Sequence, residues 1–195
     1  MTGRQDQNTG TRQVRDGHRF DVDRLETWLR AHVDGFQGPL DVSQFKGGQS
    51  NPTYLLQAAS GSYVLRRKPP GQLLKSAHAV DREFRVISAL HASGFPVPRP
   101  HILCEDAEII GTMFYVMEFV DGRIFWELDL PGMEPAEREA IYDHVNETIA
   151  RLHTIDHEAI GLGDFGVPGN YFERQISRWT RQYRASETGT IAAMD

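Results

Sequence analysis

The sequence predicts an α+β fold in which a small antiparallel sheet precedes a helical region. Two observations lead to this class. Five short segments before residue 120 alternate apolar and polar residues with period two, and one segment with helical periodicity interrupts them. After residue 120 the apolar residues recur only at helical spacing. We therefore expect a lobe with a five-stranded antiparallel sheet and one helix, followed by the first helices of an α-helical lobe.

The predicted strands share period-two patterns and lie between turn residues. They cover residues 40–45, 54–58, 63–67, 101–104 and 112–119. The first two flank a glycine-rich loop, residues 46–52, and the second and third flank a tight turn at residues 60–61. We expect residues 1–19 to form a disordered polar arm, residues 20–120 to form the sheet lobe with a leading helix, and residues 121–195 to form an incomplete helical lobe.

Four helices are predicted from apolar residues at helical spacing. Asp21 caps the first helix, and Ser76 opens the second. The third begins at Pro135, a residue that favours the first turn of a helix. Asn170 caps the fourth, in a capping box with Glu173.

Length and composition exclude several classes of protein. The chain has 195 residues, of which 39% are hydrophobic, and its net charge of −6 does not suit a general nucleic-acid binder. Its single cysteine, Cys104, excludes an internal disulfide framework and favours a reducing, cytoplasmic setting. We expect this thiol to be buried and inert. We expect no membrane span and no secretory signal, because the chain has no long apolar run and the first nineteen residues are polar.

The glycine-rich loop is the first candidate for chemistry. Its small residues let backbone N–H groups approach a phosphate, and Ser50 or Asn51 can add side-chain hydrogen bonds. An ordinary hairpin turn is the alternative, and the loop alone favours it. The residues concerned are Gly47, Gly48, Gln49, Ser50 and Asn51.

A carboxylate and a guanidinium form the second candidate. Glu83 lies three residues after Val80 and four before Ile87, so it points with the apolar face of its helix and needs a partner there. Arg66 on the preceding strand can hold a carboxylate and still donate to a phosphate. The alternatives are an ion pair that only fixes the helix to the sheet, or a Glu83 that turns to solvent. If Glu83 is buried with Arg66 as its only partner, we expect Arg66→Ala to destabilise the fold by about 3–5 kcal/mol.

Several segments resemble the aminoglycoside phosphotransferase (kinase-like) family, and within it the phosphotransferase domains of acyl-CoA dehydrogenase family members ten and eleven. The resemblance covers the chain from about residue 45 onward and is carried by FKGGQSNPTY, YVLRRKPPG, EFRVISAL, FPVPRP, FYVMEFVDGR, LHTID and GLGDFGVPGNYFERQISRWTRQY. It implies a protein-kinase-like N-lobe. It also implies transfer of the γ-phosphate of ATP, with Mg²⁺, to a hydroxyl of a small molecule.

The resemblance further implies roles for individual residues. The loop at residues 47–51 would cover the ATP phosphates, Arg66 would stand where protein kinases have a lysine, and Glu83 would orient Arg66. Three residues would surround the adenine: Met117 behind it, and Glu118 and Val120 through their backbone.

The catalytic part of the family pattern is missing from this sequence. The family uses a His-x-Asp-x-x-x-x-Asn loop to orient the acceptor hydroxyl and bind metal, but the one His-x-Asp here, at residues 32–34, precedes the glycine-rich loop. Residues 164–166 spell the magnesium tripeptide Asp-Phe-Gly, and residues 161–166 match a dinucleotide fingerprint, but both lack the required context. We expect a chain that ends before the catalytic loop, has no catalytic or metal-binding residues of its own, and is inactive alone. A C-terminal lobe or a partner chain would supply the loop.

Two weaker signals have structural interpretations as well as functional ones. His153 and His157 are four residues apart, but no third ligand with metal spacing accompanies them. The last helix carries a basic face that either contacts the phosphates of a hydroxyacyl-CoA, a substrate that the resemblance suggests, or is the solvated back of a core-facing helix. Its arginines are Arg174, Arg178, Arg181 and Arg184.

The sequence thus leaves two classes of function open. One is an ATP-dependent phosphotransferase acting on a small-molecule hydroxyl acceptor, with no nucleic-acid partner. The other is a non-catalytic nucleotide-binding or regulatory module, or a truncated remnant of the family.

Overall fold

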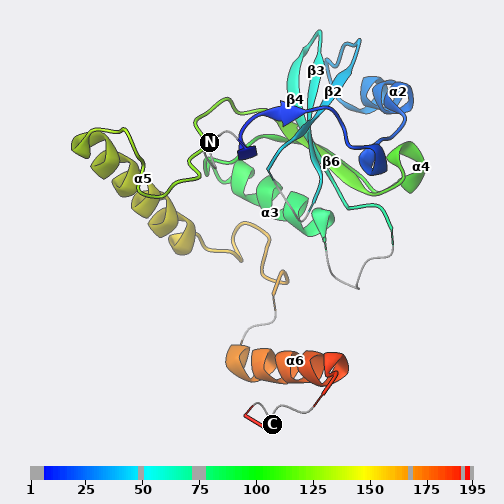
Figure 1. The fold of residues 1–195 in the computed structure, drawn as a ribbon. Coiled ribbons are helices and arrows are strands. Elements are labelled where there is room, and N and C mark those ends of the chain that lie inside the picture. Colours follow the sequence, from blue (N-terminus) through cyan, green and yellow to red (C-terminus); the bar gives the residue numbers. More distant parts are fainter. Residues whose placement is uncertain (1–6, 48–50, 72–77, 167–168, 190–191, 194–195) are drawn as a thin grey trace. The chain divides into compact units, whose positions relative to one another are not determined.

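The computed structural model describes residues 7–47, 51–71, 78–166, 169–189 and 192–193. Contacts divide the chain into two compact units, Met1–Asp156 and His157–Asp195. The first unit holds the sheet and most of the helices, and the second holds the last long helix (Figure 1).

Six antiparallel strands form one sheet in the order β1-β2-β3-β4-β6-β5 (Figure 1). They are β1 (Thr11–Arg12), β2 (Asp41–Phe45), β3 (Thr53–Ala58), β4 (Gly61–Arg67), β5 (Pro100–Cys104) and β6 (Phe114–Glu118). The five predicted strands correspond to β2 through β6, so the α+β class and the antiparallel sheet are confirmed. The predicted number of five strands is wrong by one.

The additional strand comes from the arm that was predicted to be disordered. Thr11 pairs with Phe45 and Arg12 with Gln44, which adds β1 to the edge of the sheet. Further along, the Arg15 backbone N–H donates to Gln44 Oε1 at 3.2 Å. This part of the arm is therefore held on the sheet by hydrogen bonds. Two polar residues carry no period-two signal, which is why the pattern did not reveal the strand.

The helices are η1 (Asp16–His18), α2 (Val22–His32), α3 (Val80–Ala92), α4 (Ala107–Ile110), α5 (Pro135–Thr154) and α6 (Tyr171–Ser186). The Asp21 cap is confirmed, because its Oδ1 accepts from the Arg24 N–H at 2.9 Å, and Pro135 begins α5 as predicted. Asn170 occupies the N-cap position of α6 as predicted, but its backbone is left-handed and its side chain makes no capping hydrogen bond, so the predicted capping box is wrong. Ala79 occupies the N-cap position of α3. Ser76, predicted to open this helix, lies outside the described residues.

The two faces of the sheet differ in what covers them. One face packs against α2 and the neighbouring α4, and it holds the main hydrophobic core. The core includes Leu25, Leu29, Leu56, Leu65, Ile110, Phe114 and Val116. Cys104 belongs to this core and is 3% exposed, so its predicted burial is confirmed. The other face packs against α3 beside β5 and β6.

None of the described helices combines the length and the apolar character that crossing a bilayer requires.

Candidate functional site

A polar row crosses the face of the sheet that α3 covers. Strand register places Thr53 opposite Arg66 and Arg66 opposite Tyr115, so these three side chains from β3, β4 and β6 point to the same face. One residue further along β4, Arg67 points to the opposite face, because successive side chains in a strand alternate. The register alone therefore brings a hydroxyl, a guanidinium and a phenol together.

Glu83 on α3 is the carboxylate that this row contacts. Arg66 Nε donates to Glu83 Oε2 at 2.6 Å, and Arg66 Nη2 donates to Glu83 Oε1 at 3.4 Å. The Tyr115 hydroxyl donates to Oε2 at 3.2 Å. The predicted Arg66–Glu83 pair is therefore present, and the alternative in which Glu83 turns to solvent is wrong. The Arg66 and Glu83 side chains are 26% and 34% exposed, so the pair lies at the edge of the core.

Tyr115 remains a neutral hydrogen-bond donor in this arrangement. Burial raises the pKa of its phenol far above the ordinary value of 10, and the neighbouring Glu83 carboxylate raises the pKa further. Arg66 lowers the same pKa but does not offset these two effects. Because the hydroxyl stays protonated, it remains available as the donor to Glu83 Oε2.

Asn51 is the third residue bound to Glu83. Its Nδ2 donates to Glu83 Oε1 at 2.8 Å, and its Oδ1 lies 2.8 Å from His78 Nδ1. The side chain is directed inward, and the residue is 2% exposed. Both Oδ1 and Nδ2 of Asn51 thus have partners within the protein, and its contact with a phosphate stays a prediction.

The Arg66 guanidinium is held on one side only. Its Nε, one N–H of Nη1 and one N–H of Nη2 donate to Glu83 and Thr53. The guanidinium has five N–H donors, so the two others have no protein partner among the residues that the structure describes. A fixed, partly exposed guanidinium with spare donors is suited to bind an anion such as a phosphate.

An apolar row runs beside the polar one. Strand register places Leu55 opposite Val64 and Val64 opposite Met117, one pleat away from Thr53, Arg66 and Tyr115 on the same face. Val64 is 7% exposed. An apolar surface beside a guanidinium suits a nucleotide, which joins a planar base to an anionic phosphate.

Comparison with known proteins agrees with this geometry. The model of the phosphotransferase enzyme family matches residues 41–195. The chain belongs to this family. It is 51% identical over 189 residues to acyl-CoA dehydrogenase family member 11 of Rattus norvegicus, covering 95% of this chain and 24% of that protein. It is 48% identical over 186 residues to acyl-CoA dehydrogenase family member 10 of Mus musculus, covering 95% of this chain and 17% of that protein.

A solved structure supports the same assignment. A protein of Ralstonia eutropha, described as an aminoglycoside phosphotransferase, matches with a TM-score of 0.74 and 56% sequence identity. The match covers 91% of this chain and 51% of the other. The chain thus spans about a quarter or less of the acyl-CoA dehydrogenase relatives and about half of this structure. The resemblance to the phosphotransferase family drawn from the motifs is confirmed.

Four more of the residues predicted for nucleotide binding lie in the described part of the chain: Gly47, Met117, Glu118 and Val120. Met117 and Glu118 end β6, and the Glu118 N–H donates to the Arg99 carbonyl at 2.8 Å, which fixes the backbone where the strand ends. Val120 follows and is 59% exposed. A Cβ built on Gly47 would lie 3.2 Å from the Trp126 ring. Their contacts with a nucleotide stay a prediction, and three further loop residues, Gly48, Gln49 and Ser50, lie outside the described residues.

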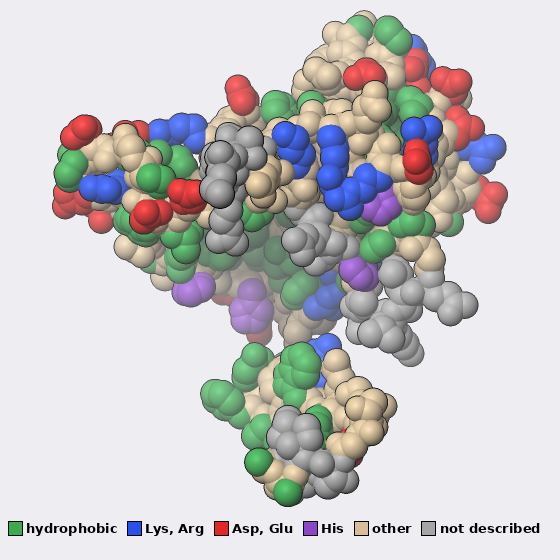
Figure 2. Space-filling view, viewed as in Figure 1, with side chains coloured by type: hydrophobic (Ala, Val, Ile, Leu, Met, Phe, Trp, Pro, Cys, Tyr) green, Lys and Arg blue, Asp and Glu red, His purple; other side chains and the backbone are tan. Residues whose placement is uncertain are grey.

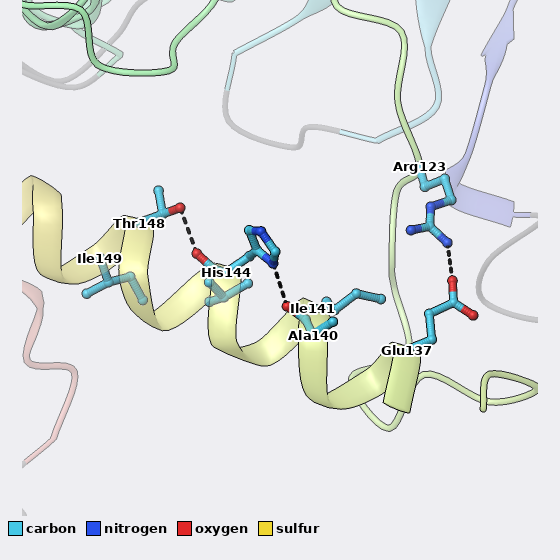
Figure 3. A pocket seen from close by; sticks show the side chains of 8 residues that line it. Arg123, Glu137, Ala140, Ile141, His144, Thr148 and Ile149 are labelled. Atoms are coloured by element: carbon cyan, nitrogen blue, oxygen red, sulfur yellow. Dashed lines mark hydrogen bonds and ion pairs between the residues drawn. The ribbon is translucent and has the colours of Figure 1, made fainter. Parts of the chain in front are cut away.

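A hollow lies along α5. Its volume is about 580 Å³, and Figure 3 shows that apart from Arg123 its walls come from a single helix. Arg123 donates to Glu137 at 2.7 Å. The apolar floor includes Ile141, Val145 and Ile149. The lining of this hollow is mainly apolar, and its one guanidinium is paired with a carboxylate.

The described residues form no candidate metal centre, since no three His, Cys, Asp or Glu side chains gather among them. The Asp-Phe-Gly sequence at residues 164–166 lies in a series of turns, where the Phe165 N–H donates to the Leu162 carbonyl at 2.9 Å. The dinucleotide fingerprint at residues 161–166 shares these turns and does not join a strand to a helix.

Sequence reasoning missed three of the residues that surround the Arg66–Glu83 pair. Thr53 and Tyr115 could have been found from the register with Arg66, because all three side chains share one face. His78 gave no signal in the sequence, since it reaches Asn51 only through the path of the chain before α3.

Proposed function

We propose that this chain is the nucleotide-binding part of an ATP-dependent phosphotransferase, acting in the cytoplasm on a hydroxyl of a small molecule. The observation that carries the proposal is the Arg66 guanidinium, which donates to Glu83 and Thr53 while two of its N–H groups have no partner in the part of the chain that the structure describes. The phosphates of ATP would accept from these groups, and the loop at residues 47–51 would cover them. Adenine would pack on the row of Leu55, Val64 and Met117 and contact the backbone of Glu118 and Val120.

The Arg66–Glu83 pair and its partners Asn51, Thr53 and Tyr115 fit the phosphates of ATP but do not offer a site for Mg²⁺. Both oxygens of Glu83 already accept hydrogen bonds from Arg66, Asn51 and Tyr115. No further carboxylate contacts Arg66 among the described residues. Mg²⁺, which neutralises phosphate charge when bound, needs oxygen ligands from elsewhere. We expect them from a C-terminal lobe or a partner chain.

The exposed surface of α5 also supports the proposal that a C-terminal lobe or a partner chain packs on this chain. This helix of 20 residues buries none of its described residues, although one of its faces is apolar. Figure 2 shows hydrophobic side chains on the surface in this region. Those on α5 are Tyr142, Val145, Ile149 and Leu152, each between 41% and 47% exposed. An apolar face of this size is usually covered, and we infer that the part carrying the catalytic loop packs on it.

A hydroxyacyl-CoA is the acceptor that we propose. Two relatives carry acyl-CoA dehydrogenase in their names. The second unit offers a basic helix, whose described arginines Arg174, Arg178 and Arg181 line one hollow of about 640 Å³. Guanidinium groups suit the phosphates of coenzyme A.

Calorimetric titration of Mg·ATP into the purified chain tests the proposal, followed by an assay of ADP formation with a hydroxyacyl-CoA. We expect binding, no transfer by the chain alone, and transfer once a polypeptide carrying the His-x-Asp loop of a relative is added. Binding that never leads to transfer would favour the non-catalytic module instead. An absence of binding would contradict the proposal and favour the remnant.

A further inference from the structure

The side chain of Asn51 joins three segments of the chain. It ends the glycine-rich loop, and it contacts His78, two residues before α3, and Glu83 within that helix. A buried amide must satisfy its donors and its acceptor within the protein. Asn51 is 2% exposed, and these two partners satisfy its oxygen Oδ1 and one N–H of Nδ2.

The chemistry of the partners fixes the orientation of this amide. An ionised carboxylate only accepts hydrogen bonds, so the nitrogen Nδ2 faces Glu83 and the oxygen Oδ1 faces His78. His78 must then carry its proton on Nδ1. Asn51 therefore accepts a hydrogen bond from His78 through Oδ1 and donates one to Glu83 through Nδ2.

Asn51 also reaches the other member of the ion pair. Its backbone carbonyl accepts from the Thr53 hydroxyl at 3.1 Å, and Thr53 Oγ1 in turn accepts from Arg66 Nη1 at 3.1 Å. The residue thus contacts Glu83 directly and Arg66 through one hydroxyl. A displacement of the end of the loop would change both halves of the pair.

His78 adopts a backbone conformation that non-glycine residues rarely have. Its φ is +59°, in the left-handed region, where a Cβ is disfavoured. Such residues persist where the surrounding structure requires them, and they cluster at functional sites. Here the conformation places the imidazole within hydrogen-bond distance of Asn51.

We propose that Asn51 and His78 are positioning residues for the Arg66–Glu83 pair. The His78–Asn51–Glu83 chain of hydrogen bonds fixes the carboxylate, and the carboxylate fixes the guanidinium that meets the phosphate. Asn51 thus acts through Glu83 and does not contact the nucleotide with its side chain. The consequence for nucleotide binding rests on the proposed function, whereas the order of the ion pair does not.

Solvent exchange of the Arg66 Nε–H, measured by ¹H–¹⁵N NMR on the full chain without nucleotide, tests the positioning directly. We expect Asn51→Asp to accelerate this exchange about tenfold, because a carboxylate replaces the donor that faces Glu83 and a hydrogen bond to a charged group is lost. His78→Ala should accelerate it by a smaller factor. His78→Asn should restore slow exchange, since an amide can donate to Asn51 and asparagine tolerates the left-handed conformation. His91→Ala, at the far end of α3, is the matched control and should have no effect.

The Kd for Mg·ATP is measured on the same variants. The proposal predicts that Kd rises about tenfold in Asn51→Asp and recovers in His78→Asn relative to His78→Ala. Unchanged Arg66 exchange in both Asn51→Asp and His78→Ala would overturn it, and so would altered exchange with unaltered Kd. If Asn51→Asp does not fold, the His78 variants decide. If the unsubstituted chain binds no ATP, the proposed function fails, and the exchange rates alone decide whether the two residues position the pair.

Discussion

Arg66 and Arg67 are neighbours on β4, but they face opposite sides of the sheet and have different surroundings. Arg67 is 2% exposed and donates only to neutral oxygens: the Tyr54 hydroxyl at 3.1 Å, the Ile110 carbonyl at 2.9 Å and the His18 carbonyl at 3.0 Å. Arg66 is partly exposed and donates to a carboxylate and a hydroxyl.

The difference suits Arg67 to a structural role and Arg66 to the ligand-binding role that we propose. Each nitrogen of Arg67 donates to a different segment of the chain. Its guanidinium therefore joins η1 and α4 to the strands β3 and β4 of the sheet. The Phe20 ring, 5.2 Å from the guanidinium carbon, adds a cation–π contact. Arg66 is fixed by Glu83 of α3, and two of its N–H groups have no partner among the described residues. Similar residues at adjacent positions thus have different surroundings because they lie on opposite faces of the sheet.

The largest effect that we expect is on stability, from Arg67→Leu. Loss of the guanidinium leaves the Ile110 carbonyl without its donor in a buried site, which costs about 1–3 kcal/mol. The His18 carbonyl keeps the Tyr54 hydroxyl as a donor, but the two other hydrogen bonds of Arg67 are lost, at about 0.5–1.5 kcal/mol each. The free energy of unfolding should therefore fall by about 3 kcal/mol. Urea denaturation measures it. Arg66→Leu is the matched control and should cost about 1 kcal/mol. Equal losses in the two variants would remove the distinction between the faces.

The modest cost expected for Arg66 corrects the sequence-based figure of about 3–5 kcal/mol. That figure assumed a buried Glu83 with a single partner. Glu83 is 34% exposed and retains Asn51 and Tyr115 when Arg66 is removed. Water and these two donors therefore limit the loss.

The next effect is on nucleotide affinity, from Glu83→Gln. The neutral amide keeps the shape of the side chain but loses the charge that holds Arg66, so we expect the Kd for ATP to rise about tenfold. The free energy of unfolding should change by about 1 kcal/mol or less because the pair is partly exposed. Calorimetry and urea denaturation measure the two quantities. A large loss of stability with unaltered affinity would make the pair a structural contact only.

A smaller effect is a pH dependence that arises on the Arg67 face. Burial lowers the pKa of His18, and Arg67 lowers it further, although Gln44 raises it through a hydrogen bond. The unfolded chain therefore takes up the proton first, and stability should decline as pH falls below the ordinary value of about 6.5. Thermal unfolding measured between about pH 8 and pH 5, the range in which histidine titrates, follows this decline. His18→Asn should reduce the slope, while burial also lowers the pKa of His101 and leaves a residual slope. The same slope in both proteins would contradict this origin.

The smallest effect that we expect is from Gly47→Ala, at the start of the glycine-rich loop. The new Cβ would lie 3.2 Å from the Trp126 ring and 3.3 Å from the Asn8 carbonyl oxygen, so both need to move by a few tenths of an ångström. We expect about a twofold rise in the Kd for ATP and a loss of stability of about 1 kcal/mol or less. Gly17→Ala, which meets nothing within 4 Å, is the control. A much larger loss of stability would show that the Trp126 ring and the Asn8 carbonyl cannot move to accommodate the new Cβ.

The sequence predicted the elements that bear period-two or helical patterns, and it predicted the Arg66–Glu83 pair from the position of one carboxylate on a helix face. The missing elements were short or polar. β1 has two polar residues, and α4 has four residues, which is too short for a helical period to appear. Asn170 shows a further limit, because a residue type that favours capping also tolerates the left-handed backbone that it adopts here.

The rest of the candidate site depends on contacts between distant segments. Arg67 was not singled out, since nothing in the sequence distinguishes it from Arg66 until the strand places them on opposite faces. Asn51 was noted as a loop residue, but its inward side chain follows from the register of β3 and the approach of His78. Such contacts require the fold to be known.

The preference of the chain for ATP over AMP tests the central claim most directly. Both ligands carry adenine, but only ATP carries the β- and γ-phosphates that the spare donors of Arg66 would meet. By calorimetry we expect ATP to bind at least about tenfold more tightly than AMP, a difference of about 1.4 kcal/mol. In Arg66→Met this preference should largely vanish while AMP affinity stays the same. An ATP preference that survives unchanged in Arg66→Met would contradict the assignment of Arg66 as the phosphate-binding residue.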